Sequence, residues 1–343
     1  MIYICCRWWQ VKMAILFFCC NVVNCVVIYV MVMKTFIDSF VNYLLILCKG
    51  WVYKMRKYVI STDSTCDLPE SFITENNVEV IPVLYSINDV VYGTPDSNMD
   101  IKDFYDAMRN GIMPTTMACN IEDCKTAFEK YAKEGLDILH LAFSSGLSST
   151  YNNAVIAAND IMEEYPDCKI TVIDTLAASM GEGMLVYYAV KLKNEGKSME
   201  EVATYIEDNK ANVISRFTVD DLHHLHRGGR VSKTTAIVGS LINVKPILHV
   251  DKDGLLKSLE NVRGRKKSLS KILDMMEEAT RDYEGSNEIA FLSHGDCEED
   301  ANYIAAEIEK RFGIKTMVNI LGQTIGTHTG PNLIALFFMG NKR

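Results

Sequence analysis

The sequence lacks several patterns that identify familiar classes of protein. It has no Cys-x-x-Cys pair, and the five cysteines after residue 54 are scattered, which argues against a disulfide framework or a zinc site and favours a reducing cytoplasm. It also has no Gly-x-x-x-x-Gly-Lys-[Ser/Thr] loop for holding ATP phosphates. Only seven prolines interrupt 343 residues, of which 48% are hydrophobic, so the chain has room for two compact domains.

The 44 acidic residues outnumber the 35 basic ones, and the charge is unevenly distributed along the chain. The net charge is -9, yet residues 1–54 hold five basic residues and one acid, which gives +4. The remainder therefore carries -9 - 4 = -13. An acidic body without a basic stripe argues against nucleic acid as the main partner.

Residues 1–54 differ in composition from the rest of the chain. Residues 13–33 contain 21 residues without a formal charge, flanked by Lys12 and Lys34, which is about long enough to span a bilayer. No small-residue cleavage site follows, so a removed signal peptide fits poorly. Two interpretations stay open: a true membrane anchor, or upstream sequence ahead of a start at Met55 that would leave a cytoplasmic protein.

From residue 55 onward, short apolar runs alternate with helical periodicity, the pattern of an α/β fold. We expect strands at 58–62, 78–84, 136–143 and 169–174, with helices at 101–110, 122–134, 150–164, 181–195 and 199–209. A second set follows, with strands at 246–250, 288–293, 315–320 and 333–338 and helices within 268–283 and 300–312. We therefore predict two domains, 55–215 and 216–343.

Three of the expected strands end in polar tips. These tips are Asp63–Thr65, Ser144–Ser145 and Asp174–Thr175. Because the carboxyl ends of parallel strands meet at one edge of a sheet, where open α/β folds bind ligands, we expect the tips to lie together.

Five hydroxyl side chains follow the apolar run that ends at Phe143: Ser144, Ser145, Ser148, Ser149 and Thr150. The simplest interpretation is that Ser148 or Ser149 caps a helix starting near Thr150. A cap uses one hydroxyl, however, and free N–H groups beside several hydroxyls form a good seat for a carboxylate or phosphate. A serine nucleophile elbow is not indicated, because Thr150 stands where its second glycine is required.

Two further segments carry polar side chains. Thr115 and Thr116 follow a proline and read as turn residues, unless the fold brings them near Ser148. Arg227 and Arg230 flank two glycines, and arginine forks suit carboxylate and phosphate oxygens, although a tight turn with solvated charges is the simpler alternative.

Histidines appear in two places: just before the Arg227–Arg230 segment and at position 328. His223, His224 and His226 have no neighbouring cysteine or acid to complete a familiar ligand set, so no metal is expected. His328 stands among threonines and glycines just before the last strand, and we expect it on a sharply turning loop that presents it to a ligand.

Six segments, taken in order, resemble the DegV family and cover nearly all of residues 57–343: VISTDSTCDLP, FSSGLSSTYNNA, VIDT…GEG, LHRGGRVS, KPIL and GTHTGP. The resemblance implies an α/β fold of two domains, an N-terminal three-layer α/β/α domain with a parallel sheet and a C-terminal α/β domain with a mixed sheet. It also implies a long-chain fatty acid bound between them. The carboxylate would be presented to a separate ATP-binding fatty acid kinase subunit, and the chain would carry the acyl phosphate for lipid synthesis, with membrane contact for lipid exchange.

The resemblance also implies the site residues, and it implies a carrier without catalytic residues, metal or cofactor of its own. Those matched to the carboxylate are Thr116, Ser148 with its neighbour Ser149, and His328; those near the head group or the kinase interface are Arg230 and Arg227. The sequence departs from the family pattern in three places: the Thr-Ser-Gln-Pro motif reads Thr116–Cys119, the glycine after Ser148 is Ser149, and Gly-Pro-Gly ends in Asn332.

Two other functions stay open on the sequence. A serine-dependent hydrolase or acyltransferase would use Ser148 and His328 with an acid such as Asp63. A membrane-anchored lipid-binding protein would use residues 13–33 as its anchor.

Overall fold

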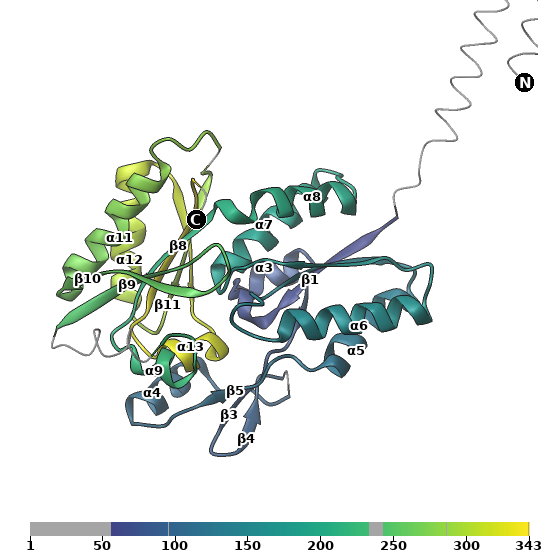
Figure 1. Ribbon diagram of the computed structural model, residues 1–343, viewed down its shortest axis with the longest axis horizontal. Helices are drawn as coiled ribbons and strands as arrows, with labels where there is room; N and C mark the ends of the chain where they lie inside the picture. Colours follow the sequence, from purple (N-terminus) through teal and green to yellow (C-terminus); the bar gives the residue numbers. More distant parts are fainter. Residues whose placement is uncertain (1–55, 95, 233–242, 286, 342) are drawn as a thin grey trace, which may run out of the picture. The chain divides into compact units, whose positions relative to one another are not determined.

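The computed structural model describes residues 56–343, apart from residues 95, 233–242, 286 and 342 (Figure 1). Residues 1–54, with the candidate span at 13–33, lie outside the described residues. In the part of the chain that is described, no helix has both the length and the apolar character needed to cross a bilayer. Residues 56–343 form one compact unit.

A four-stranded parallel sheet occupies the N-terminal part, in the order β2-β1-β6-β7. Its strands are β1 (Tyr58–Asp63), β2 (Glu79–Ile81), β6 (Asp137–Ala142) and β7 (Ile170–Asp174). Helices α5 (Ile121–Lys133) and α6 (Thr150–Glu164) pack on one face, and α7 (Met180–Asn194) and α8 (Met199–Asn209) on the other. β1 and β6 are buried along their whole length because both faces are covered. The predicted three-layer arrangement is confirmed.

A six-stranded mixed sheet occupies the C-terminal part, in the order β10-β9-β8-β13-β11-β12. Its strands are β8 (Val213–Thr218), β9 (Val244–Val250), β10 (Leu256–Arg263), β11 (Ile289–His294), β12 (Lys315–Ile320) and β13 (Ile334–Met339). Only β11 and β12 pair in parallel among these neighbours. Helices α11 (Arg265–Thr280) and α12 (Glu298–Phe312) cover one face of this sheet (Figure 1).

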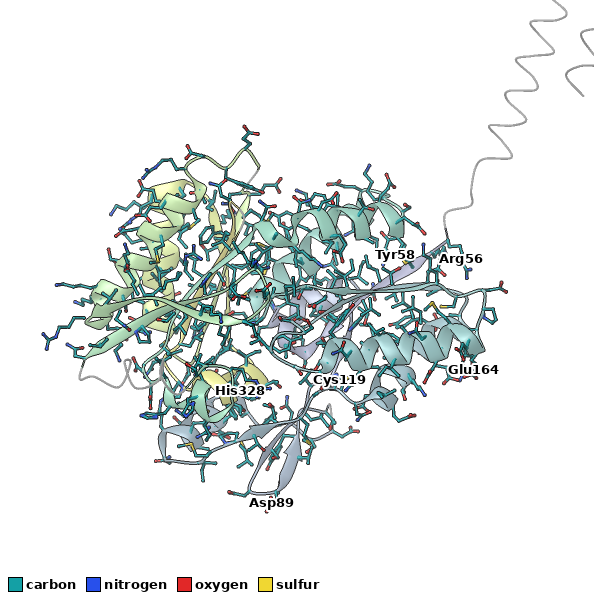
Figure 2. The ribbon with its side chains drawn as sticks, viewed as in Figure 1. Arg56, Tyr58, Asp89, Cys119, Glu164 and His328 are labelled. Carbon is teal, nitrogen blue, oxygen red and sulfur yellow. The ribbon has the colours of Figure 1, made fainter. Side chains whose placement is uncertain are left out.

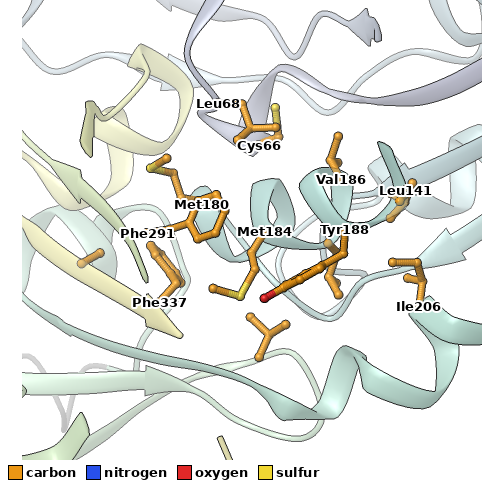
Figure 3. Close-up of a cluster of buried hydrophobic side chains, with 14 of the residues drawn as sticks. Cys66, Leu68, Leu141, Met180, Met184, Val186, Tyr188, Ile206, Phe291 and Phe337 are labelled. Atoms are coloured by element: carbon orange, nitrogen blue, oxygen red, sulfur yellow. The ribbon is translucent and has the colours of Figure 1, made fainter. Parts of the chain in front are cut away.

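Helix α7 lies between the two sheets and joins their cores. Met184 belongs to a cluster that includes Leu141 of the first sheet and Phe291 and Phe337 of the second (Figure 3). The helix is buried on most of its circumference, which explains why its sequence is apolar without a polar stripe. The two sheets are therefore held in a fixed relation by one shared core.

A third, small antiparallel sheet was not predicted. It contains β3 (Tyr85–Ile87), β4 (Val90–Tyr92) and β5 (Thr115–Thr116), and it packs with α4 (Ile101–Arg109). The predicted strand at 78–84 ends at Ile81, because Pro82 has no N–H with which to continue the ladder. Shorter elements complete the chain: η1 (Ser64–Cys66), α3 (Glu70–Glu75), η2 (Lys210–Asn212), α9 (His223–Arg227) and α13 (Gln323–Thr329).

Candidate functional site

The polar tips of the parallel strands lie together, as predicted. The Phe143 N–H donates to Asp63 Oδ2 at 2.8 Å, and the Ser145 N–H donates to Asp174 Oδ1 at 3.2 Å. These bonds join the ends of β1, β6 and β7 at the carboxyl edge of the first sheet.

Beside this edge lies a cavity of about 310 Å³, lined by strands of the second and third sheets and by residues that follow strands of the first. Most of its lining side chains are apolar, including Phe143 after β6, Phe217 on β8 and Phe337 on β13. Ile325 of α13 and Leu147 of the loop before α6 complete the apolar wall near the polar end. A hydrocarbon chain would find an apolar surface along most of this space.

Five of the six predicted site residues line this cavity: Thr116, Ser148, Ser149, Arg230 and His328. They come from β5, the loop before α6, the segment after α9, and α13, so the fold gathers them from distant parts of the sequence. The sixth, Arg227, lines a neighbouring outer pocket instead.

His328 and Thr116 are in direct contact. His328 Nε2 lies 2.8 Å from Thr116 Oγ1 (Figure 2 labels His328). The prediction that His328 stands on a loop was wrong, because it lies in α13, which ends at Thr329 and is followed by Gly330 at the capping position. Glycine is a poor helix former, and the glycines at 322, 326 and 330 concealed this helix in the sequence.

Gly228 allows the backbone to approach the His328 ring closely. A Cβ added at Gly228 would stand 2.2 Å from His328 Nδ1, so any larger residue would displace the imidazole. The adjacent Gly229 has a φ of 76°, the left-handed conformation that glycine tolerates best. One glycine of the pair therefore allows a close approach of the backbone, and the other allows a positive φ.

The imidazole of His328 is neutral near pH 7. Burial, and then the charges of Arg230 and Arg227, lower its pKa to about 4. A neutral imidazole donates from one ring nitrogen and accepts at the other. With Nε2 as donor, the Thr116 hydroxyl is free to donate to a ligand oxygen.

At the start of α6, the hydroxyl of Ser148 rather than that of Ser149 forms hydrogen bonds. Its Oγ accepts from the Thr150 N–H at 3.2 Å and lies 2.9 Å from Thr150 Oγ1. Ser149 stands at the capping position, but its side chain makes no capping bond, since its φ of -76° and ψ of 1° differ from the extended conformation usual there. Ser149 is exposed and lines the cavity.

Arg230 connects the loop before α6 with the segment after α9 through hydrogen bonds. Its Nε and Nη2 donate to the Leu147 carbonyl at 3.2 and 3.0 Å, and its Nη1 donates to the Gly228 carbonyl. Burial lowers the pKa of Arg230. Arg227 is exposed, and its Nη1 contacts the Met113 sulfur.

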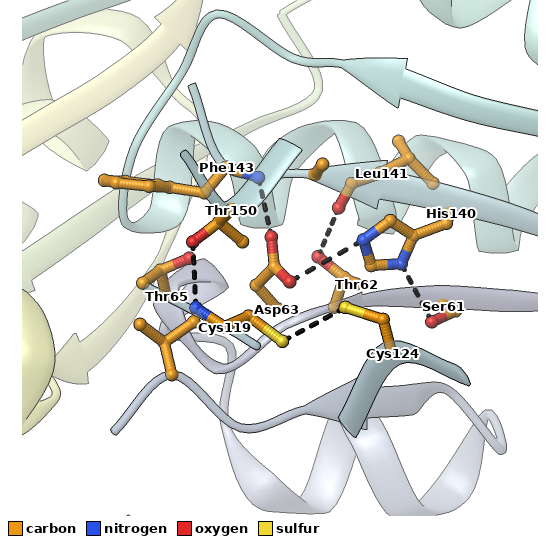
Figure 4. Close-up of polar contacts among 12 residues, drawn as sticks. Ser61, Thr62, Asp63, Thr65, Cys119, Cys124, His140, Leu141, Phe143 and Thr150 are labelled. Atoms are coloured by element: carbon orange, nitrogen blue, oxygen red, sulfur yellow. Dashed lines mark hydrogen bonds and ion pairs between the residues drawn. The ribbon is translucent and has the colours of Figure 1, made fainter. Parts of the chain in front are cut away.

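Ser148, His328 and Asp63, the residues suggested for a serine hydrolase, do not form a hydrogen-bonded catalytic triad. His328 bonds to Thr116 rather than to Ser148. Asp63 faces His140 instead, with 3.6 Å between Asp63 Oδ1 and His140 Nε2 (Figure 4). Burial lowers the pKa of His140 to about 3 and raises the pKa of Asp63 to about 7, so both groups favour their neutral forms. We therefore describe this contact as part of the core rather than as an ion pair.

The described ranges contain no group of three or more His, Cys, Asp or Glu side chains that could hold a metal ion. Phe217 and Phe337 of the apolar wall could not be identified from the sequence, because nothing there distinguishes them from ordinary core residues.

Comparison with known proteins decides the family. The DegV family model matches residues 57–341. The chain belongs to the DegV family. A DegV domain-containing protein of Clostridium perfringens is 41% identical over 84% of this chain and 99% of its own.

Solved structures of DegV proteins share the fold. A DegV-family protein from Thermus thermophilus, whose structure is described as fatty-acid binding, has a TM-score of 0.74 and 30% identity over 83% of this chain and 99% of its own. DegV of Bacillus subtilis, described as a fatty acid binding protein, has a TM-score of 0.73 and 28% identity over 83% of this chain and 100% of its own.

Proposed function

We propose that this DegV protein binds a long-chain fatty acid, with the tail in the apolar cavity and the carboxylate at Thr116, Ser148 and His328. The observation that carries the proposal is that these three residues line one largely apolar cavity. The two solved DegV structures described as fatty-acid binding support the same ligand class. Ser149 lines the same cavity, and we expect its side chain to limit the space beside Ser148.

The energetics favour a lipid over a small acid. Burying about 14 methylenes at about 0.8 kcal/mol each contributes roughly 11 kcal/mol before the costs of binding. A hydrogen bond to a charged carboxylate contributes roughly 1.5–3 kcal/mol. The tail therefore dominates the affinity, whereas the hydroxyls and the imidazole fix the orientation of the head group.

The outer pocket suggests how the carboxylate is used. It has a volume of about 220 Å³ and includes Arg227 together with Thr116, Arg230 and His328, three residues that also line the apolar cavity. The polar residues thus stand between a space for the tail and an outer space bordered by arginines. Arginine forks match phosphate oxygens.

We infer from this arrangement that a separate ATP-dependent kinase subunit phosphorylates the bound carboxylate and that this protein carries the acyl phosphate for lipid synthesis. The sequence contains no phosphate-binding loop, so the partner supplies the nucleotide site. On this proposal the protein acts in the cytoplasm as a non-catalytic carrier without a cofactor or metal, and it contacts membranes to exchange its lipid.

Native purification of the full chain, followed by mass spectrometry of the released ligand, tests the lipid proposal. We expect a long-chain fatty acid in about equal amount to the protein. A protein that releases no lipid and fails to bind added palmitate would refute it. Adding the purified kinase subunit and ATP should then yield acyl phosphate, and no product would refute the carrier role alone.

A further inference from the structure

Two cysteines meet close to the polar end of the cavity. Cys119 Sγ lies 3.1 Å from Cys124 Sγ (Figure 4). Cys119 immediately precedes Asn120, the capping residue of α5, and Cys124 lies within the first turns of that helix. Both are buried, with exposed fractions of 1% and 0%. Within the described part of the chain, no other two cysteine sulfurs are in contact.

The backbone of Cys119 is connected to the head-group site. Its N–H donates to Thr150 Oγ1 at 3.3 Å, and Thr150 Oγ1 lies 2.9 Å from Ser148 Oγ. The Cys119 carbonyl accepts from Asn153 Nδ2 of α6 at 2.8 Å. Cys119 is thus two hydrogen bonds away from Ser148, in a segment that departs from the family motif.

We propose that Cys119 and Cys124 form a reversible disulfide, and that its formation weakens the head-group site. The oxidant is a low-molecular-weight disulfide. One cysteine thiolate attacks it and releases the first small thiol, leaving a mixed disulfide. The second cysteine attacks the bound protein sulfur and releases the second small thiol. Each cysteine loses one proton, each released thiolate gains one, and the oxidant is reduced to two thiols.

The geometry indicates which side must move. A disulfide requires a sulfur separation of about 2.05 Å, so the pair must close by roughly 1 Å. Cys124 is fixed in α5, where it packs in the same core cluster as Phe128. Cys119 lies between β5 and α5, outside regular structure. Both cysteines belong to the same buried cluster, but only Cys124 is held in a helix. We therefore expect closure to draw Cys119 toward α5 and to lengthen its N–H bond to Thr150, which at 3.3 Å is the longer of the two bonds that connect it to Ser148.

Bound ligand should oppose this reaction. Contact with Cys124 and burial both raise the pKa of the Cys119 thiol, so attack is slow while the segment is closed. A carboxylate held by Ser148 would stabilise the closed arrangement. The effect on ligand affinity rests on the proposed function, whereas the disulfide itself does not.

The disulfide can be detected directly by peptide mass. Trypsin cleaves after Arg109 and Lys125, so both cysteines lie on one peptide, residues 110–125. Full-length protein stripped of lipid is exposed to oxidised glutathione, its free thiols are blocked, and it is digested. We expect this peptide to be lighter by two hydrogens, reversibly with dithiothreitol, and to form more slowly when palmitate is bound. Full alkylation of both cysteines after prolonged exposure would overturn the disulfide.

Affinity measurement tests the coupling. We expect oxidation to weaken palmitate binding about fivefold, the equivalent of one hydrogen bond. Cys119→Ser and Cys124→Ser should abolish this sensitivity, whereas Cys168→Ser, at a buried thiol elsewhere, should retain it. An oxidised peptide with unchanged palmitate affinity would overturn the coupling. Absence of palmitate binding in both redox states would count against the proposed function and the coupling, while the peptide mass would still decide the disulfide.

Discussion

The Thr62 hydroxyl lies within hydrogen-bonding distance of two oxygens, the Leu141 carbonyl and the Glu182 carboxyl. Thr62 Oγ1 lies 2.8 Å from the Leu141 carbonyl oxygen and 2.8 Å from Glu182 Oε1. A hydroxyl has one hydrogen, so Thr62 cannot donate fully to both oxygens, and a protonated Glu182 would let both contacts be complete hydrogen bonds. Burial, and then the neighbouring Asp63, raise the pKa of Glu182, in agreement with this assignment. Glu182 Oε2 accepts from Thr65, whose side chain lines the cavity.

Replacing Glu182 tests its protonation. Glu182→Gln keeps the shape and neutrality, with an amide N–H to donate to Thr62 and an oxygen to accept from Thr65. We expect its free energy of unfolding to stay within about 1 kcal/mol of wild type. Glu182→Ala should lose about 2–4 kcal/mol through the cavity and the lost bonds. Urea denaturation would measure both, and equal losses in the two variants would show that Glu182 is ionised.

Stability should fall with rising pH because of Asp63. Burial raises the pKa of Asp63 from 3.8 to about 7, so the folded state binds more protons than the unfolded state between these values. The stability that Asp63 contributes is complete below about pH 4 and is lost as the pH rises toward 7. His140 acts in the opposite direction, because burial lowers its pKa from 6.5 to about 3 and acid therefore favours unfolding.

The variant Asp63→Asn separates the contribution of Asp63 to the pH dependence of stability from that of His140. Asparagine retains an oxygen for the Phe143 N–H but does not titrate. Measured against pH from 4 to 7.5, the unfolding free energy of wild type should decline relative to that of the variant. A constant difference would contradict the assigned pKa direction of Asp63.

His328→Ala should separate binding from phosphorylation. The tail dominates affinity, so losing one head-group bond should weaken palmitate binding by about tenfold. Acyl-phosphate formation with the kinase subunit should fall by about a hundredfold or more, because orientation of the reacting oxygen is lost. Binding is measured by displacement of a fluorescent fatty acid and product by mass spectrometry. An equal fall in both quantities would contradict this division between the tail and head group.

Gly228→Ala should act through the His328 ring. The added methyl would stand 2.2 Å from Nδ1, so the imidazole must move away from Thr116. We expect slower acyl-phosphate formation with little change in unfolding free energy. Gly229→Ala is the matched control: its Cβ would meet no atom within 4 Å, but its φ of 76° is unfavourable for alanine. It should lower stability by about 1 kcal/mol and affect the reaction less; the reverse ranking would contradict the role of Gly228.

Periodic and capped segments were predictable from the sequence. Helix α8 begins at Met199 and ends at Asn209 as expected, with a Ser198–Glu201 capping box. The parallel strands and their polar tips followed from apolar runs ending at Asp63 and Asp174. β10 could not be found in this way, because its edge position leaves most of its side chains partly or fully exposed and removes the apolar pattern.

The sequence predicted five residues that line the cavity, but it did not predict the contacts among them. Thr116 and His328 are 212 positions apart, and no local pattern indicates that their side chains meet. The family resemblance supplied these two residues, whereas the close approach of Gly228 and the cysteine pair depend on tertiary packing. Short segments such as β5, only two residues long, are fixed by their neighbours rather than by intrinsic propensity.

The most direct test of the central claim is a crystal structure of the full-length protein loaded with palmitate. The account predicts carboxylate oxygens within hydrogen-bonding distance of Ser148 and Thr116, and a tail lying against Phe217 and Phe337. A carboxylate bound elsewhere, or a cavity without lipid while palmitate occupies another surface, would contradict it.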